Sequence, residues 1–379
     1  MVFERVSFIL ILYVIFLIWV DKAQSLDNTD LNTKKLALSS IVLYVLGVES
    51  KTILARCKFF VPFFGRKEFL IMEKYTQKKL RNQLLQTLVS EHVTEKTLER
   101  VKECNTFLFM VADKTMENTK LHRSNNCEHR FCPVCAWKKA RKNALKISIL
   151  MQYLKEEENK EFLFLTLTAP NVKADELNDE IKHYNQSFQR LMQRKEVKAA
   201  VKGYVRKLEV TYNKDRDDYH PHFHVILAVN KSYFTDTKSY ITRDRWLELW
   251  QKSTKNPLIT QVDIRRVKHT DSKKEVSEIA KYSAKDSDYL QDKTVFDTFY
   301  KTLTGKRLIV YSGLFKDANK LYENKKLEHY KEIDPIQYIY QIFYHWGHTD
   351  YIQTEQKLMS EDMQKEVNQN MLEDTDIEE

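Results

Sequence analysis

The chain has 379 residues, 42% hydrophobic and 30% charged, a composition typical of a globular protein and not of a disordered one. Its formal net charge of +9 points to a polyanionic partner, and five cysteines in a chain of this length exclude a disulfide scaffold. No complete P-loop is present, so we expect no ATP hydrolysis, and any unwinding of a duplex must come from another protein.

Residues 1–71 contain two apolar runs, at residues 8–20 and 36–48. The first run precedes Ala23-Gln24-Ser25, which suits a signal peptidase, but as a helix it would rise only about 20 Å. The segment is compatible with a signal peptide, a membrane-associated hairpin or an upstream in-frame extension without function. We expect the extension, because a charged amphipathic stretch begins at Met72. Reduced cysteines further along favour a cytoplasmic protein, and membrane association through residues 1–71 remains an alternative.

Residues 72–158 are predicted to form a helical, cysteine-rich region. Cys132 and Cys135 have the two-residue spacing of a zinc knuckle, in which a tight turn brings both thiolates to one ion. A structural Zn²⁺ site is therefore expected here. Its ligands would be Cys104, Cys127, Cys132 and Cys135, with His122 and His129 as competing ligands.

A basic helix is expected directly after these cysteines. Lysines and arginines follow Trp137 in close succession, and such a helix suits contacts to phosphate groups. The candidate DNA-binding residues are Lys138, Lys139, Arg141 and Lys142.

Residues 159–292 alternate between strand and helix patterns. Strands are predicted at residues 161–168, 204–212, 222–229 and 261–267, with amphipathic helices at 177–191 and after Thr242. This βαββαβ order is the ferredoxin-like arrangement, an antiparallel sheet with helices on one face. The fold class is therefore α+β, with the zinc region before this domain. A helical C-terminal region at 293–350 and an acidic tail at 351–379 follow it.

The strand pattern brings candidate metal ligands together. Side chains alternate between the two faces of a strand, so His222 and His224 project to one side while Phe223 enters the core. A carboxylate must complete such a site, and Glu209 on the paired strand is the expected third ligand. A mixed nitrogen and oxygen ligand set suits Mn²⁺ or Mg²⁺ together with phosphate oxygens.

A helix predicted at residues 273–285 carries the candidate catalytic groups. At helical spacing, Glu278, Tyr282 and Lys285 fall within about 60° of one another on an exposed face. Such a face is usually a solvated set of ion pairs. Beside a metal site, however, Tyr282 becomes a candidate nucleophile, with Lys285 favouring the phenolate and Glu278 as a later general base.

In this order, the motifs resemble the replication initiator (Rep) proteins of small Gram-positive plasmids, within the HUH endonuclease superfamily. The resemblance covers residues 72–343. The HUH signature corresponds to His222-Phe223-His224, the upstream strand motif to residues 164–168, and the single-tyrosine motif to residues 278–285.

The resemblance implies a rolling-circle replication initiator. Tyr282 would nick the double-strand origin and stay joined to the 5′-phosphate, leaving a 3′-OH primer, and Glu278 would serve as the base that ends the cycle. The implied partners are origin DNA, single-stranded or as an extruded hairpin, with a host helicase, a DNA polymerase and a possible second copy in a homodimer. The alternatives are a single-tyrosine relaxase or transposase, or a non-catalytic zinc-containing nucleic-acid-binding protein.

Overall fold

The computed structural model describes residues 66–237, 239–268, 272–281, 283–369, 371–375 and 377. These residues belong to the second of two compact units, Gly65–Glu379. Residues 1–65, with both apolar runs, lie outside the described residues, and so does Tyr282. No helix in the described part of the chain is long and apolar enough to cross a membrane.

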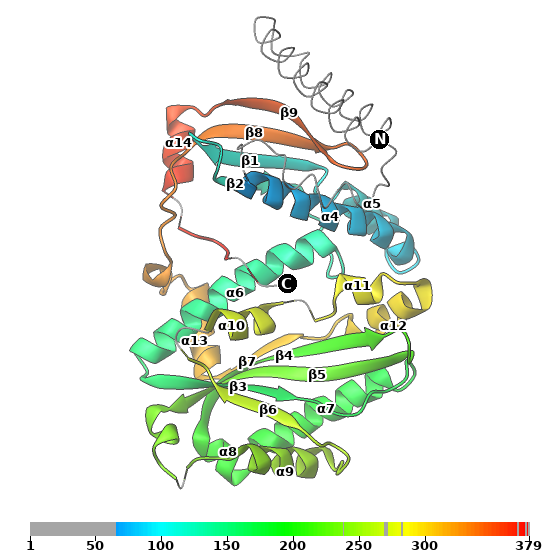
Figure 1. Ribbon diagram of the computed structural model, residues 1–379, viewed down its shortest axis with the longest axis vertical. Helices are drawn as coiled ribbons and strands as arrows, with labels where there is room; N and C mark the ends of the chain where they lie inside the picture. Colours follow the sequence, from blue (N-terminus) through cyan, green and yellow to red (C-terminus); the bar gives the residue numbers. More distant parts are fainter. Residues whose placement is uncertain are drawn as a thin grey trace, which may run out of the picture. The chain divides into compact units, whose positions relative to one another are not determined.

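The larger sheet has five antiparallel strands in the order β6-β3-β5-β4-β7 (Figure 1). The strands predicted at residues 204–212 and 222–229 form a hairpin and pair along their length. All four predicted strands of this region are present, and a fifth is added from the C-terminal region. The strands are β3 (Lys160–Leu167), β4 (Val201–Asn213), β5 (Asp218–Asn230), β6 (Val262–Arg266) and β7 (Ile309–Gly313).

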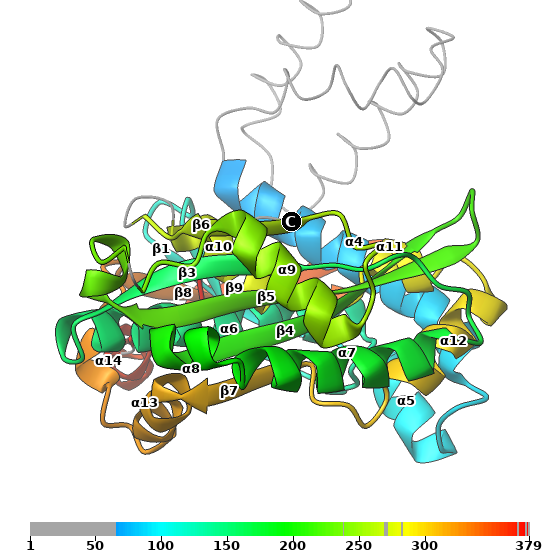
Figure 2. The same cartoon turned by 90° about the horizontal axis from the view of Figure 1, so that it is seen from below.

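Helices cover both faces of this sheet, so the expectation of helices on one face is wrong. One face carries α7 (Leu177–Met192), α8 (Lys195–Ala200) and α9 (Arg243–Thr254), which lie in front of β4 and β5 in Figure 2. Helices α6 (Pro133–Glu156) and α10 (Ser272–Ala280) pack on the opposite face (Figure 1). The ferredoxin-like pattern includes only the helices between its four strands. Helix α6 comes before the first of those strands, β3, and α10 comes after the last, β6.

Apolar periodicity explains the packing of the first helical layer. The stripe predicted for α7 is entirely buried, and Phe223 of β5 packs its ring against the aromatic rings of that stripe. In α9 the side chain of Thr242 caps the helix, and the Trp246 and Trp250 side chains are fully buried. The buried α7 stripe consists of Leu177, Ile181, Tyr184, Phe188 and Leu191.

A second sheet combines both ends of the described chain. Its order is β2-β1-β8-β9, with β1 (Phe107–Asp113) and β2 (Thr119–Ser124) from the cysteine-rich region. Strands β8 (Tyr338–Trp346) and β9 (Tyr351–Leu358), with α14 (Glu361–Asn368), come from the C-terminal region and the acidic tail. Residues 338–346, expected to be helical, form a strand, and the acidic tail contains a strand and a helix. Residues 338–346 are rich in aromatic and β-branched side chains, which favour a strand once a partner is present.

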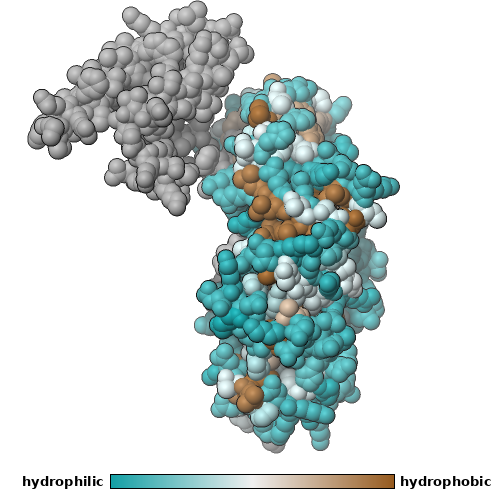
Figure 3. All heavy atoms as spheres, turned by 90° about the vertical axis from the view of Figure 1, so that its right-hand side faces the viewer, coloured by the Kyte–Doolittle hydropathy of each residue, from teal (hydrophilic) through white to brown (hydrophobic). Residues whose placement is uncertain are grey.

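Seven further helices and 3-10 turns complete the described part of the chain. The helix predicted from Met72 is present as α4 but begins earlier, at Arg66, and its apolar stripe is only partly covered: Leu85 is buried, whereas Leu84 is 57% exposed. The face shown in Figure 3 is mainly hydrophilic, with a few apolar patches. The other elements are α4 (Arg66–Val89), α5 (Glu95–Glu103), η1 (Lys231–Phe234), α11 (Asp286–Tyr289), α12 (Lys293–Leu303), α13 (Leu314–Glu323) and η2 (Glu328–Tyr330).

Candidate metal centre and tyrosine segment

Three side chains of the hairpin converge on one point. Glu209 of β4 lies opposite His222 of β5, and Lys207 lies opposite His224. The Nε2 atoms of the two histidines are 3.1 Å apart, and Oε2 of Glu209 lies 3.4 Å from Nε2 of His224 and 3.9 Å from Nε2 of His222. The structure therefore brings together the three expected ligands as a group that could hold a metal ion.

Two hydrogen bonds orient the imidazoles. Nδ1 of His222 lies 3.2 Å from the carbonyl oxygen of His220. A carbonyl only accepts, so this nitrogen carries the proton and Nε2 presents its lone pair to the site. Nδ1 of His224 lies 3.3 Å from Oγ1 of Thr166, which faces it across the β3–β5 pairing. Contacts of this kind fix the ring orientation and tautomer of metal-binding histidines.

A buried lysine sets the charge of the site. The Lys207 side chain has no exposed surface, and its Nζ donates to Oε2 of Glu209 at 2.8 Å. Burial opposes ionisation of Glu209, but the Lys207 ammonium and a hydrogen bond from His224 outweigh it and hold the pKa of Glu209 well below its usual range. Burial lowers the pKa of His222 to about 4. At neutral pH the site thus holds a carboxylate and a neutral His222 imidazole, the forms that bind metal.

The predicted helical face for the catalytic residues is wrong. Helix α10 ends at Ala280, before Tyr282, and the side chain of Lys285 is exposed at the position that caps α11. Glu278 and Lys285 therefore do not share one helix. Glu278 remains in the last turn of α10, and Tyr282 itself lies outside the described residues.

The chain on both sides of Tyr282 is hydrogen-bonded to β4. The backbone N–H of Val210, one residue after Glu209, donates to the carbonyl of Ser283 at 2.8 Å. Nζ of Lys207 donates to the carbonyl of Glu278 at 3.0 Å. The strand that supplies the carboxylate ligand thus also binds the segment that contains the candidate nucleophile.

Glu278 lies at the edge of the candidate metal centre. Its Oε2 is 4.0 Å from Nε2 of His224, and its Oε1 accepts a hydrogen bond from Lys281 at 2.8 Å. Burial alone would raise the pKa of Glu278, but the hydrogen bond and charge of Lys281 prevail and lower it. Glu278 is therefore a carboxylate at neutral pH, the form that a general base requires.

Further contacts anchor the chain beyond Tyr282. Asp286 is buried and ion-paired with Lys78 and Arg81 of α4. Tyr289, the next tyrosine in the chain, is 3% exposed and donates its hydroxyl to the carbonyl of Phe131 at 2.9 Å. Burial makes Tyr289 unsuited to attack on a DNA strand, whereas Tyr282 remains the candidate.

The four expected zinc ligands also come together. Sγ of Cys104 lies 3.6 Å from Sγ of Cys132 and 3.4 Å from Sγ of Cys135, and Sγ of Cys127 lies 3.7 Å from that of Cys135. Bonds of about 2.3 Å in a tetrahedral zinc site place sulfurs about 3.8 Å apart, so the spacing suits one ion. His129 lies outside this group, as does His122.

Neighbouring donors suit a thiolate cluster. The amide nitrogens of Asn82 and Asn105 lie 3.4 Å from Sγ of Cys132 and 3.2 Å from Sγ of Cys104. The backbone N–H of Cys127 also donates to Sγ of Cys104 at 3.3 Å. Hydrogen bonds from the surrounding thiols lower the pKa of Cys104, which favours its thiolate form.

The four basic residues predicted on α6 divide into two pairs. Nζ of Lys138 is used within the cysteine region, where it donates to Oδ1 of Asn105 at 2.7 Å. Arg141 is ion-paired with Asp374 of the C-terminal segment at 2.8 Å. Lys139 and Lys142, by contrast, are exposed. The helix is basic as expected, but only the second pair is available for phosphate contacts.

Sequence reasoning missed two residues of the site. Strand alternation placed Lys207 on the face of Glu209, but gave no reason to expect a fully buried ammonium there. Thr166 was part of the upstream strand motif, and its contact with His224 depends on the register between β3 and β5. β3 and β5 are not joined by a hairpin turn, so no turn between them sets their register, and the pattern of either strand alone does not identify this contact.

The fold and site describe a mixed α/β protein with a candidate metal centre on an antiparallel sheet. Comparison with known proteins identifies its family. Residues 118–352 match the family described as "Replication protein". A "Protein rep" of Staphylococcus aureus is 58% identical over 223 residues, which cover 59% of this chain and 97% of that protein. No solved structure matches the chain.

More distant relatives carry the same name. A "Protein rep" of Bacillus amyloliquefaciens is 37% identical over 252 residues, covering 59% of this chain and 73% of the relative. One from Streptococcus pneumoniae serotype 2 is 35% identical over 239 residues, which cover 62% of this chain and 74% of that protein. The chain belongs to the replication protein family, the replication initiators (Rep) of plasmids, as its motifs led us to expect.

Proposed function

We propose that this initiator nicks one strand of its plasmid origin by attack of Tyr282 on a phosphodiester, in the manner of HUH endonucleases. One observation carries the proposal: β4 supplies Glu209 to the candidate metal centre and, at the next residue, binds the segment next to Tyr282. The β3-to-β6 core, with strands in the order β6-β3-β5-β4, supports a ferredoxin-like domain that presents both features.

The reaction assigns each group a role. Oη of Tyr282 attacks phosphorus, a 5′-phosphotyrosine bond forms, and the bond to the 3′ oxygen breaks. The phenol loses its proton and the departing oxygen gains one, which leaves a 3′-OH primer. The phenol of free tyrosine has a pKa near 10, so a nearby cation must favour the phenolate, a role that we assign to Lys285 because it lies three residues further along the chain. Glu278, a carboxylate beside His224, accepts a proton during the second cleavage, which ends the cycle.

The ligand sets fit two kinds of metal. Glu209, His222 and His224 would hold Mg²⁺ or Mn²⁺, because the three side chains supply nitrogen and oxygen donors and can leave positions for phosphate oxygens. Such an ion, when bound, polarises the scissile phosphate. The four thiols have Sγ–Sγ distances of 3.4–3.7 Å and amide donors around them, and this arrangement fits a structural Zn²⁺.

The partners follow from this chemistry. Origin DNA must reach the site as a single strand or an extruded hairpin, and the 3′-OH product is a substrate for a host DNA polymerase. A host helicase would open the duplex, because the sequence contains no complete P-loop. Nicking would take place in the cytoplasm, where thiols stay reduced. A homodimer is compatible with this scheme.

A covalent adduct tests the proposal directly. The full chain is incubated with a single-stranded origin oligonucleotide, labelled on the 3′ side of the expected nick, and Mn²⁺. A labelled, protease-sensitive adduct is expected from the wild type and not from Tyr282→Phe or His222→Ala. Tyr282→Phe should still bind the oligonucleotide. An adduct that persists in Tyr282→Phe would overturn the assignment of the nucleophile, and no adduct from the wild type would favour the non-catalytic reading.

A further inference from the structure

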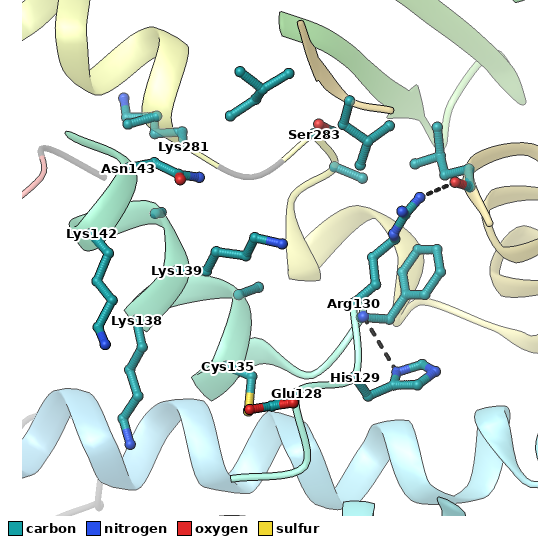
Figure 4. Close-up of a pocket in the computed structure, with 18 of the residues that line it drawn as sticks. Glu128, His129, Arg130, Cys135, Lys138, Lys139, Lys142, Asn143, Lys281 and Ser283 are labelled. Atoms are coloured by element: carbon teal, nitrogen blue, oxygen red, sulfur yellow. Dashed lines mark hydrogen bonds between the residues drawn. The ribbon is translucent and has the colours of Figure 1, made fainter. Parts of the chain in front are cut away.

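A basic cleft opens beside the tyrosine segment. It has a volume of about 900 Å³ and lies between α6, the segment at residues 280–284 and the loop that joins α12 to β7. Lys281 and Ser283, the neighbours of Tyr282 in the chain, both line it (Figure 4). The cleft therefore reaches the segment in which the proposed nucleophile stands.

The charge of the cleft is almost entirely positive. Eight lysine or arginine side chains line it, against the single carboxylate of Glu128. Five of the eight are held by polar groups of the protein: Lys146 pairs with Glu323, for example, and Lys281 pairs with Glu278. Those five shape the walls and supply a positive field.

Three cations of the cleft have no hydrogen bond or ion pair with the described residues. Lys139 and Lys142 lie one helical turn apart on α6, and Arg307 is exposed on the loop after α12. Figure 4 shows the Lys139 side chain extending from α6 toward the segment that carries Ser283. Cations that face one cleft from two elements distant in the sequence, without internal partners, suit an external polyanion better than an ordinary solvated helix face.

The walls between these cations are apolar and aromatic. Phe131, Ala140, Leu308 and Tyr311 line the cleft together with the charged groups. A groove that combines cations with aromatic and apolar surface matches a single strand, whose phosphates and base faces both need contacts. A duplex would offer only its phosphates and groove edges to such a surface.

We propose that this cleft binds the single-stranded DNA that leads to the scissile phosphate, with Lys139, Lys142 and Arg307 contacting successive phosphates. The inference rests on the proposed nicking function and adds the path of the strand. Arg307 is then a DNA-binding residue outside the motifs by which the sequence was interpreted. Lys138 and Arg141 act instead in holding the cysteine region and the C-terminal segment in place.

Charge reversal at the cleft provides the test. Lys139→Glu and Arg307→Glu are compared with Lys301→Glu and Lys316→Glu, exposed lysines outside the cleft that have no ion pair among the described residues. Binding of a single-stranded origin oligonucleotide is measured by fluorescence anisotropy across a salt series. Each cleft variant should bind on the order of tenfold more weakly, and its salt slope should fall by about 0.7 per lost phosphate contact. The control variants should match the wild type in slope.

Two further measurements separate the possible outcomes. The double variant Lys139→Gln/Arg307→Gln removes the charges without reversing them, and unchanged thermal melting excludes a folding defect. If the wild type forms the adduct but cleft and control variants bind DNA equally, the cleft proposal is overturned while nicking stands. If cleft variants lose binding while the wild type forms no adduct, the cleft is supported and nicking fails. Loss of duplex binding alone would also overturn the single-strand assignment.

Discussion

Nζ of Lys207 lies 2.8 Å from Oε2 of Glu209, and the lysine side chain has no exposed surface. The same ammonium donates to the carbonyl of Glu278 at 3.0 Å, in the last turn of α10. One buried cation therefore touches a candidate metal ligand and the helix that leads into the tyrosine segment. Lys207 is a positioning residue, because it acts on the site through these two groups.

Replacing Lys207 with methionine should destabilise the metal-free protein and make its stability depend on metal. Removing one partner of a buried ion pair costs about 3–5 kcal/mol, because the other charge is left without compensation. A divalent ion can supply that compensation to Glu209. The melting temperature of Lys207→Met should therefore rise more on addition of Mn²⁺ than the melting temperature of the wild type does. Lys198→Met, at an exposed position, is the control and should behave as the wild type. Equal responses of Lys207→Met and the wild type would contradict this role.

Thr166→Val should weaken metal binding without removing a ligand. The substitution keeps the shape of the side chain and deletes the hydroxyl 3.3 Å from Nδ1 of His224. Loss of such an orienting contact typically lowers metal affinity by about 10–100-fold. The Mn²⁺ concentration for half-maximal nicking should rise accordingly, with near-normal nicking at saturating Mn²⁺. A defect that excess Mn²⁺ does not relieve would argue against an orienting role.

Cys132→Ser should abolish zinc binding and loosen the region around it. The thiol of Cys132 is buried among the other three, so one substitution breaks the ligand set. Protein purified without chelators should carry close to one zinc per chain, and the variant should carry little and be cleaved faster by protease near residues 104–146. Cys57→Ser, at the one cysteine of the sequence outside this group of four, is expected to retain the metal. Metal-free wild-type protein would contradict the assignment.

Glu278→Ala should separate initiation from termination. The first nick uses a tyrosine, so loss of a carboxylate should affect it little. The second cleavage lacks that nucleophile and needs a base, which is typically worth about 10²–10⁴-fold. Supercoiled origin plasmid should therefore be nicked nearly normally while multimeric single strands accumulate. If Glu278 only pairs with Lys281, an interaction worth about 0.5 kcal/mol, the variant should release monomeric circles as the wild type does.

Local patterns predicted the centre of the protein well. Alternation along β4 and β5 placed Glu209, His222 and His224 on one face, and the structure brings them within bonding reach of one ion. Cysteine spacing likewise selected a group that the fold assembles from α5, a loop and the start of α6. These inferences succeeded because strand alternation and short ligand spacings are local properties.

The end of α10 shows where local patterns stop. Residues 281–285 contain no glycine or proline, and their periodicity continues the helix. The structure ends the helix at Ala280, and the carbonyl of Ser283 accepts its hydrogen bond from Val210 of β4. A contact with a distant strand thus overrides helix propensity, which is a weak preference. The second sheet was missed for a similar reason, since β8 finds its partner β1 far away in the chain.

The second sheet can be completed only after the C-terminal strands of the chain have been synthesised. Phe109 of β1 pairs with Phe343 of β8, which a ribosome adds more than two hundred residues later. All five strands of the larger sheet can emerge while β1 still has an unpaired edge. A chain that stops before Tyr338 would retain every candidate metal ligand but lack β8, the strand that pairs with the second edge of β1. In a cell, such an unfinished initiator would carry an open strand edge, which invites aggregation.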